Sequence, residues 1–180
     1  TSDQYAGAAA DELVDPRLVT YRHGVKGLGS PGTATKSCAA STRWYRDTFG
    51  GDFGTMSADA ATVERGCEGL FFHPYLQGEI TPYLDDKLRA SFTGAAGFHT
   101  RAHFNRAVLE GVAYSMKDCY ETLREMGAAP TEAVAIGGGA KSDLWRQILS
   151  DMLGIPLKTV ENVDSSLGSA MLAGVATGVF

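Results

Sequence analysis

The second half of the chain alternates between helical and strand-like patterns, and this alternation limits the folds that are open to it. Residues 101–127 and 142–153 each carry an apolar stripe at helical spacing. A short apolar run at 133–136 is typical of a strand, and the segment "PLKTV" at 156–160 is expected to form another. A helix rich in small residues, 165–179, ends the series and could pack very close to a neighbour. The order helix, strand, helix, strand, helix predicts an α/β fold.

Three consecutive glycines, residues 137–139, join the first of these strands to the helix at 142–153, for which Ser142 is the expected N-cap. A glycine-rich turn between a strand and a helix lets a flat or anionic ligand approach the backbone. The same turn is also typical of a tight bend that needs positive φ. The spacing matches neither the dinucleotide-binding G-x-G-x-x-G pattern nor the P-loop, which Lys141 does not complete. The turn alone therefore leaves both interpretations open.

Charge and composition exclude several classes of function. The 180 residues carry a net charge of −5 and no run of Lys or Arg, which disfavours nucleic acid and anionic membranes as partners. No apolar stretch approaches the roughly 20 residues of a membrane span. The four histidines and three cysteines lack the spacing of metal ligands. We therefore expect no metal site in this chain, small hydrophobic roles for the cysteines, and a reducing, cytoplasmic location.

The first half of the chain is less regular. Residues 36–51 predict a helix, and residues 52–69 predict another short helix followed by a turn. Residues 70–94 begin as an apolar strand and then become a loop, because Pro74 and Pro82 cannot sit in a central strand.

Three segments in order, residues 71–94, 103–114 and 135–157, form a recognisable set. The middle of the set has the most specific layout, in which an aromatic residue and a glycine precede a helix that carries a His, a small residue and a Glu at fixed spacing. The residues that fit this layout are Phe92, Gly94, His103, Phe104, Ala107, Leu109 and Glu110. Ala95 departs from it, since a larger aliphatic residue is usual there. Together the segments resemble the carboxy-terminal half of the FGGY family of carbohydrate kinases, most closely its xylulokinase-like branch.

This resemblance implies an actin-like, ribonuclease H-like α/β domain that closes over ATP. In the family the Gly-Gly-Gly-Ala turn lies beside the adenosine. Carried over to this sequence, Gly138, Gly139 and Ala140 contact the nucleotide, with Ser142 and Asp143 as nearby polar candidates. A purine is a flat aromatic body, and glycines let it rest directly on the backbone. The cofactors implied are ATP and Mg²⁺, with the metal held mainly by the ATP phosphates and by the other lobe of the kinase.

The first residues, "TSDQYAGAA", resemble the short family segment that carries a catalytic Asp where the two lobes meet. The resemblance makes Asp3 the general base and places Gln4 beside the sugar. A sugar hydroxyl that attacks the γ-phosphate must lose its proton, and a positioned carboxylate can accept it. The alternative is that Asp3 is an exposed residue on a frayed terminus. We assign residues 1–10 to the interlobe catalytic segment and residues 1–180 to the carboxy-terminal domain.

Two parts of the family pattern are missing from this sequence. The Gly-, Thr- and Ser-rich hairpin that wraps the ATP phosphates in the family does not follow Asp3. The N-terminal lobe, with its metal-binding Asp and most of the sugar contacts, and the extreme C-terminus are also absent. We expect that a mobile phosphate loop has been left out of the sequence near residues 8–15. An unbroken series of Cα steps of about 3.8 Å through residues 6–16 would contradict that expectation.

The expected function is ATP-dependent phosphorylation of a sugar hydroxyl, on D-xylulose or a related ketopentose or polyol. This chain would be the nucleotide-binding lobe, inactive in isolation. The expected partners are the sugar, ATP and the N-terminal lobe of the same protein, with a homodimer left open. The alternative from a different class is a non-catalytic nucleotide-binding or subunit-interface domain of the same fold.

Two other enzymatic interpretations are disfavoured. Glu79 with Asp85 and Asp86 could suggest the paired carboxylates of a glycosidase, but we expect loop residues that face the cleft or solvent. The ingredients of a Ser-His-Asp triad occur in the chain, but no nucleophile elbow accompanies them.

Overall fold

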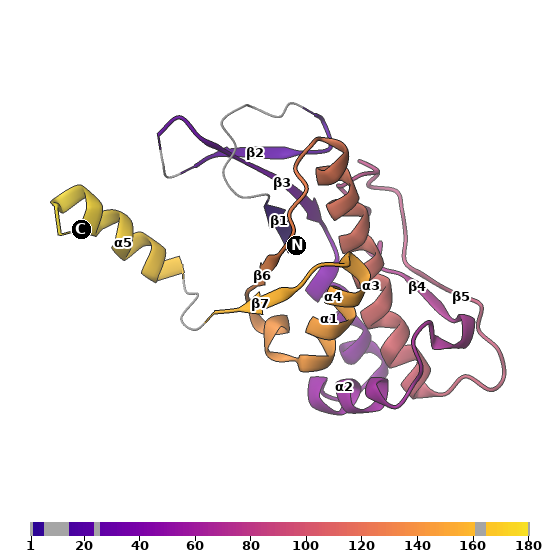
Figure 1. Ribbon diagram of the computed structural model, residues 1–180. Coiled ribbons are helices and arrows are strands. Elements are labelled where there is room, and N and C mark those ends of the chain that lie inside the picture. The colour runs from indigo at the N-terminus through magenta and orange to yellow at the C-terminus, as the bar shows by residue number, and fades with distance from the viewer. Residues whose placement is uncertain (1, 6–14, 24–25, 161–164, 180) are drawn as a thin grey trace.

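The structure is a computed structural model that describes residues 2–5, 15–23, 26–160 and 165–179 (Figure 1). The phosphate loop expected near residues 8–15 lies, except for Asp15, outside the described residues. The helices are α1 (Cys38–Phe49), α2 (Phe53–Ala61), α3 (Arg101–Glu125), α4 (Asp143–Leu153) and α5 (Ser165–Thr177). The strands are β1 (Ser2–Tyr5), β2 (Val19–Arg22), β3 (Gly29–Thr35), β4 (Phe71–His73), β5 (Ser91–Thr93), β6 (Ala133–Ala135) and β7 (Leu157–Thr159). Two short 3₁₀ turns are η1 (Cys67–Gly69) and η2 (Gly138–Lys141).

The strands pair in three small groups. β1 and β2 each run antiparallel to β3, and β4 runs antiparallel to β5. β6 and β7 are parallel, with Ala133 beside Leu157, and α4 connects them. A parallel pair needs such a crossover, so this is the strand–helix–strand unit that the sequence predicts.

The helices predicted from periodicity are confirmed, and so are the residues expected to begin and end them. α3 ends just before Gly127, which has a φ of 86°. The side-chain oxygen of Ser142 accepts a hydrogen bond from the backbone N–H of Trp145 at 3.3 Å, so Ser142 caps α4 as expected. α4 ends at Gly154 in the left-handed conformation. His103 lies in the first turn of α3, where its Nδ1 accepts a hydrogen bond from the backbone N–H of Thr100.

Helix α3 is the centre of the core, and it links two apolar clusters. One cluster packs Ala107 and Val108 of α3 against residues of α1, α2, η1 and β4. In the other, Ala113 of α3 meets Ile148 and Leu149 of α4. Through the second cluster α3 holds α4 in place, and α4 in turn positions the glycine turn that precedes it.

The β6 strand is more exposed than its apolar sequence predicts. Val134 is 51% exposed and Ile136 is 64% exposed, so the prediction of a buried strand is wrong for the described residues. The physical reason is that β7 is the strand paired with β6 in this part of the chain, and α4 packs on one side of the pair.

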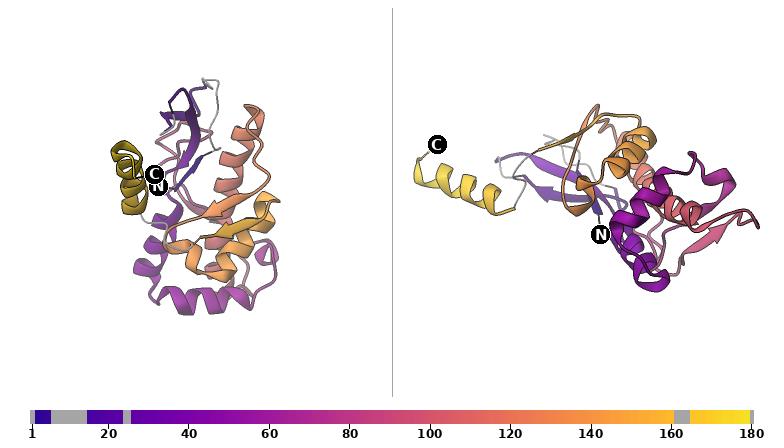
Figure 2. Two further views of the ribbon diagram at one scale, coloured as in Figure 1. Left: turned by 60° about the vertical axis from the view of Figure 1, so that its left-hand side comes forward. Right: turned by 90° about the horizontal axis from the view of Figure 1, so that it is seen from below.

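Helix α5 lies apart from the other elements in Figure 1 and in the right-hand view of Figure 2. Its apolar side chains are exposed, among them Leu167, Met171 and Val175. The expectation that this helix packs very close to a neighbour is therefore not met within the described residues. Small residues in α5 would allow another element to pack closely against it, but they do not themselves provide that element.

Glu79 is fully buried, which corrects the expectation that it faces the cleft or solvent. Its carboxylate accepts hydrogen bonds from Thr35 Oγ1 at 2.6 Å, from the backbone N–H of Lys36 at 2.8 Å and from Ser115 Oγ at 3.1 Å. A buried polar group is tolerated when it is hydrogen-bonded in this way. Glu79 therefore joins the loop after β4 to the end of β3 and to α3, which is a structural role.

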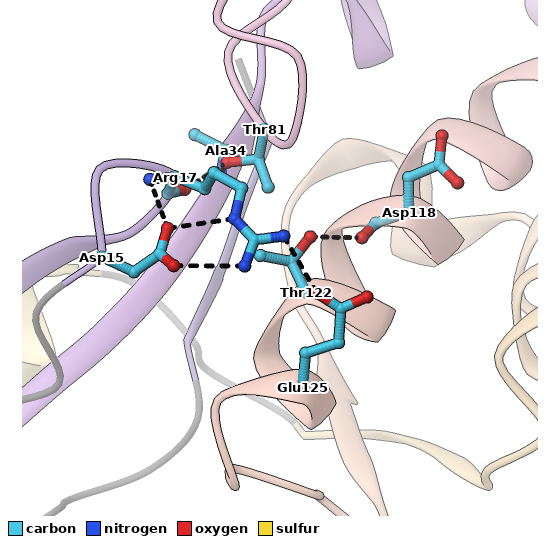
Figure 3. Close-up of polar contacts among 7 residues, drawn as sticks. All are labelled: Asp15, Arg17, Ala34, Thr81, Asp118, Thr122 and Glu125. Atoms are coloured by element: carbon cyan, nitrogen blue, oxygen red, sulfur yellow. Dashed lines mark hydrogen bonds and ion pairs between the residues drawn. The ribbon is translucent and has the colours of Figure 1, made fainter.

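Arg17 fastens the segment before β2 to the end of α3 (Figure 3). Its guanidinium donates to both carboxylate oxygens of Asp15, at 3.0 and 3.1 Å, and to Glu125 Oε2 at 2.9 Å. These hydrogen bonds from Arg17 hold the pKa of the Asp15 carboxyl below its usual value. The backbone oxygen of Arg17 accepts from Thr81 Oγ1, which itself accepts from the backbone N–H of Ala34. The contacts join the edge of the three-stranded sheet to the helical core.

The three cysteines are free and buried, as their expected hydrophobic roles require. Burial raises the pKa of the Cys67 and Cys119 thiols to about 12.

In the described part of the chain, no group of three or more His, Cys, Asp or Glu side chains is arranged to hold a metal ion. None of the helices found there is both long and apolar enough to cross a membrane.

Candidate functional site

The carboxyl ends of β6 and β7 open onto a cleft of about 330 Å³, called here the β6–β7 cleft. Ligands of open α/β sheets bind outside the carboxyl ends of parallel strands, and small-molecule sites start at about 300 Å³. The cleft is lined by Ala135, Ile136, Gly137, Ala140, Lys141, Arg146, Thr159 and Val160. Its wall is therefore apolar on the strand side and carries two cationic residues on the side of the turn and α4.

The three positions of the turn differ in how strongly the fold requires glycine. Gly137 has a φ of 88° and a ψ of −174°, a conformation that is essentially restricted to glycine. A Cβ on Gly139 would lie 3.1 Å from Nε1 of Trp145, so the packing of that ring favours glycine. Gly138 does not have a left-handed φ, and a Cβ on it would meet no described atom within 4 Å. Of the three, Gly138 is the glycine that the described fold does not require.

The first turn of α4 fixes the shape of the glycine turn. The backbone N–H of Ala140 donates to the Gly137 carbonyl at 3.2 Å, and the N–H of Ser142 donates to the Gly139 carbonyl at 3.1 Å. The guanidinium of Arg146 donates to the carbonyl oxygen of Ala140 and pairs with the Asp143 carboxylate. The turn is therefore held by its own helix before any ligand arrives.

Ser142 and Asp143, expected as polar contacts to the nucleotide, interact here with α4 and α2. Besides capping α4, the Ser142 hydroxyl lies 3.3 Å from that of Ser57 in α2. Asp143 is an ion-pair partner of Arg146, and its side chain is 92% exposed. Neither residue lines the β6–β7 cleft. Of the residues predicted to contact nucleotide, Ala140 lines the cleft, whereas Gly138 and Gly139 lie in the turn beside it.

Asp3 and Gln4, expected at the catalytic position, lie in the three-stranded sheet. Their backbones pair with Ala34 and Thr33 of β3. The structure therefore places the expected catalytic segment and the expected nucleotide turn in separate elements.

Several cleft residues were not singled out from the sequence, among them Ile136, Thr159 and Val160. A signal for them was present, because both strands are predicted and each of these residues lies at a strand's carboxyl end or directly after it. The rule that parallel strands bind ligands at that edge points to these positions. Arg146 carried no such signal, since its contact with Ala140 depends on how α4 folds back on the turn.

The sequence profile described as the FGGY family of carbohydrate kinases, C-terminal domain, matches residues 10–177. The chain belongs to this family. Its match to the profile begins after Asp3 and Gln4 and includes the whole of the β6–β7 cleft. The resemblance drawn from the sequence motifs is thereby confirmed.

Two curated relatives and one solved structure illustrate the similarity. A xylulose kinase of Staphylococcus epidermidis is 36% identical over 169 residues, which cover 92% of this chain and 34% of the relative. A gluconokinase of Bacillus subtilis is 36% identical over 150 residues, covering 76% of this chain and 29% of the relative. The crystal structure of xylulose kinase from Rhodospirillum rubrum superimposes with a TM-score of 0.84 at 31% identity, covering 94% of this chain and 35% of that one.

These similarities confirm the predicted fold class, the actin-like α/β architecture of sugar kinases. The chain spans about a third of the length of the relatives that it matches.

Proposed function

We propose that this chain is the nucleotide-binding lobe of an ATP-dependent sugar kinase. The observation that carries the proposal is the β6–β7 cleft, which Gly137 and Ala140 of the glycine turn help to line, in a chain of the FGGY family. The relatives named xylulose kinase support D-xylulose, or a related ketopentose or polyol, as the phosphate acceptor. Because another relative is named gluconokinase, sugar acids such as gluconate are also candidate phosphate acceptors.

The adenosine would lie against the turn at residues 138–140. A purine offers a flat apolar face, and Ile136 and Val160 supply apolar wall on the strand side of the cleft. Because Arg146 and the turn's own hydrogen bonds already fix the backbone, binding would cost little conformational entropy in this region.

Mg²⁺ takes oxygen ligands, usually one or two carboxylates together with substrate phosphates. None of the described residues that line the cleft is acidic. The Mg²⁺ that such kinases use would be held by the ATP phosphates and by the preceding lobe.

We assign the general-base role to Asp3 and place Gln4 beside the sugar, on the strength of the "TSDQYAGAA" segment. In the reaction, the sugar hydroxyl transfers its proton to the Asp3 carboxylate. The hydroxyl oxygen then forms a bond to the γ-phosphorus, and the bond to the β-phosphate oxygen breaks to release ADP. The pairing of β1 with β3 would support the backbone at this position.

The remaining partner is a preceding lobe that brings most of the sugar contacts. Relatives about three times as long as this chain support such a lobe, and we place its closure over the β6–β7 cleft. Since most of the sugar and metal contacts would lie in that lobe, the isolated chain should not phosphorylate sugar. We place the complete protein in the cytoplasm, where its free cysteines remain reduced.

The test is sugar-dependent ADP release by the complete protein. Purified protein is incubated with ATP, Mg²⁺ and a panel of ketopentoses, polyols and gluconate, and ADP is measured with and without each sugar. ADP release that requires one member of the panel supports the proposal. Retained ADP binding with no release on any member would instead identify a non-catalytic nucleotide-binding domain. The absence of any nucleotide binding would overturn both.

A further inference from the structure

The two cationic residues of the β6–β7 cleft differ in whether their charge is already paired. The charge of Arg146 is already paired within the protein, since its guanidinium contacts the Ala140 carbonyl and the Asp143 carboxylate. Lys141 is exposed and makes no side-chain hydrogen bond or ion pair within the described part of the chain. None of the described residues that line the cleft is acidic. Among these residues, Lys141 supplies an unpaired ammonium group beside a largely apolar wall.

The other usual source of positive charge at such a turn is weakened here. In many strand–turn–helix units an anion binds to the free N–H groups at the helix N-terminus. At α4 the Ser142 hydroxyl already occupies the N–H of Trp145, and Asp143 places a carboxylate in the first turn. A negative side chain at this end partly cancels the positive end of the helix dipole. A phosphate at this cleft would therefore depend on Lys141 more than on α4.

We propose that Lys141 binds the α-phosphate of the nucleotide, and so makes the cleft prefer nucleotides to nucleosides. The inference rests on the proposed function, in which adenosine lies against residues 138–140 of the same turn. Lys141 directly follows that turn and lines the cleft, so the phosphate nearest the ribose is the one that its side chain would meet first. A Lys ammonium group is a compact charge that serves phosphate binding without needing a planar fork.

The experiment compares three ligands that differ only in phosphate number. Binding of adenosine, AMP and ADP to the complete protein is measured by calorimetry, with weak ligands measured by displacement of ADP. The variants are Lys141→Met, Lys141→Arg and the matched control Lys158→Met. Lys158 is an exposed lysine of β7 that pairs with Glu132 and does not line the cleft. Thermal unfolding of each variant checks that the fold is intact.

We expect Lys141→Met to weaken AMP and ADP at least fivefold and to leave adenosine unchanged. Lys141→Arg should restore most of the loss, and Lys158→Met should have no effect. Raising the salt concentration should weaken AMP binding less in Lys141→Met than in the unmodified protein, because one charge contact is gone. An equal loss for adenosine and AMP, or no loss for either, would overturn the role of Lys141. If the unmodified protein binds none of the three ligands, the nucleotide function itself fails, which is a distinguishable result.

Discussion

Gly138 is the residue at which the proposed nucleotide site can be tested with least disturbance to the fold. The Cβ of a new side chain there would point into open space, and the backbone is not left-handed. Gly138→Val should therefore change the free energy of unfolding by no more than about 0.5 kcal/mol. A base that rests on this backbone would be displaced, so the Kd for ADP should rise at least tenfold, or about 1.4 kcal/mol.

The matched control for this prediction is Gly97→Val, since a Cβ at Gly97 likewise meets no described atom within 4 Å and its φ is not left-handed. Calorimetry with ADP and a denaturation curve on each variant supply the two measurements. Unchanged ADP affinity in Gly138→Val would mean that the purine does not rest on this turn.

Asp3 is the residue whose proposed role depends on sequence resemblance alone. If it is the general base, Asp3→Asn should lower kcat of the complete protein by about 10²–10⁴-fold, the usual contribution of such a group. The KM for ATP should stay the same, since the carboxylate acts on the sugar hydroxyl. Asp86→Asn, at an exposed position, serves as the control. Wild-type turnover in Asp3→Asn would rule out Asp3 as the general base.

Burial of single polar residues was the least predictable property at this scale. Glu79 lies in a polar, proline-containing loop, which favours an exposed position from sequence alone. Its burial depends on donors that lie 36 to 44 residues away, on Ser115, Lys36 and Thr35. Local sequence patterns carry no information about such distant partners, so the carboxylate was assigned to the wrong environment.

At the scale of whole elements, periodic segments were predictable and short non-periodic strands were not. α3 and α4 carry long apolar stripes together with capping residues, and their bounds follow from both. β3 contains two glycines and Pro31 and was not predicted as a strand. Its residues from Pro31 to Thr35 are nonetheless buried, because it is the central strand between β1 and β2. Tertiary packing there overrides strand propensity.

The packing of α3 on β4 depends on a close approach at Gly111. A Cβ at this position would lie 2.1 Å from the carbonyl oxygen of Phe72, so helix and strand would have to move apart. Gly111→Ala should therefore lower the free energy of unfolding by about 1–3 kcal/mol, although alanine favours a helix more than glycine does.

The comparison variant is Gly168→Ala in α5, where a Cβ would meet no described atom within 4 Å. This change should stabilise its helix by up to about 1 kcal/mol, because the backbone loses less entropy on folding. Urea denaturation of both variants provides the measurement. If Gly111→Ala were as stable as the unmodified protein, the close approach of α3 to β4 would be wrong.

At the scale of the whole molecule, the family was predictable from the sequence, whereas the residues that line the β6–β7 cleft were not. The linked motifs at 71–94, 103–114 and 135–157 are sufficient to indicate the FGGY family, because their order and spacing are specific to it. The cleft itself forms where two strands from separate segments end side by side. The two strand ends come together only when the chain folds, so a motif within one segment cannot predict that they are adjacent.

Alkaline conditions should destabilise the whole molecule through its buried thiols. The thiols of Cys67 and Cys119 have an ordinary pKa near 9.0, which burial raises to about 12 in the folded state. A raised folded-state pKa means that the protonated thiol is favoured by folding. Its contribution is complete below pH 9 and is lost as the pH rises toward 12. The free energy of unfolding should then fall by up to about 1.4 kcal/mol per pH unit for each thiol.

Urea denaturation between pH 8 and 11 measures this slope, and the Cys67→Ala/Cys119→Ala double variant should show less of it. An identical slope in the double variant would assign the alkaline loss to other groups.

The central claim is that the turn at residues 138–140 and the adjoining β6–β7 cleft receive the adenosine of ATP. The most direct measurement is a crystal structure of the complete protein with a nonhydrolysable ATP analogue. We predict that electron density for the purine lies on the backbone of residues 138–140, with its α-phosphate toward the Lys141 ammonium group. A purine bound at another position, with this turn and cleft left unoccupied, would contradict the claim.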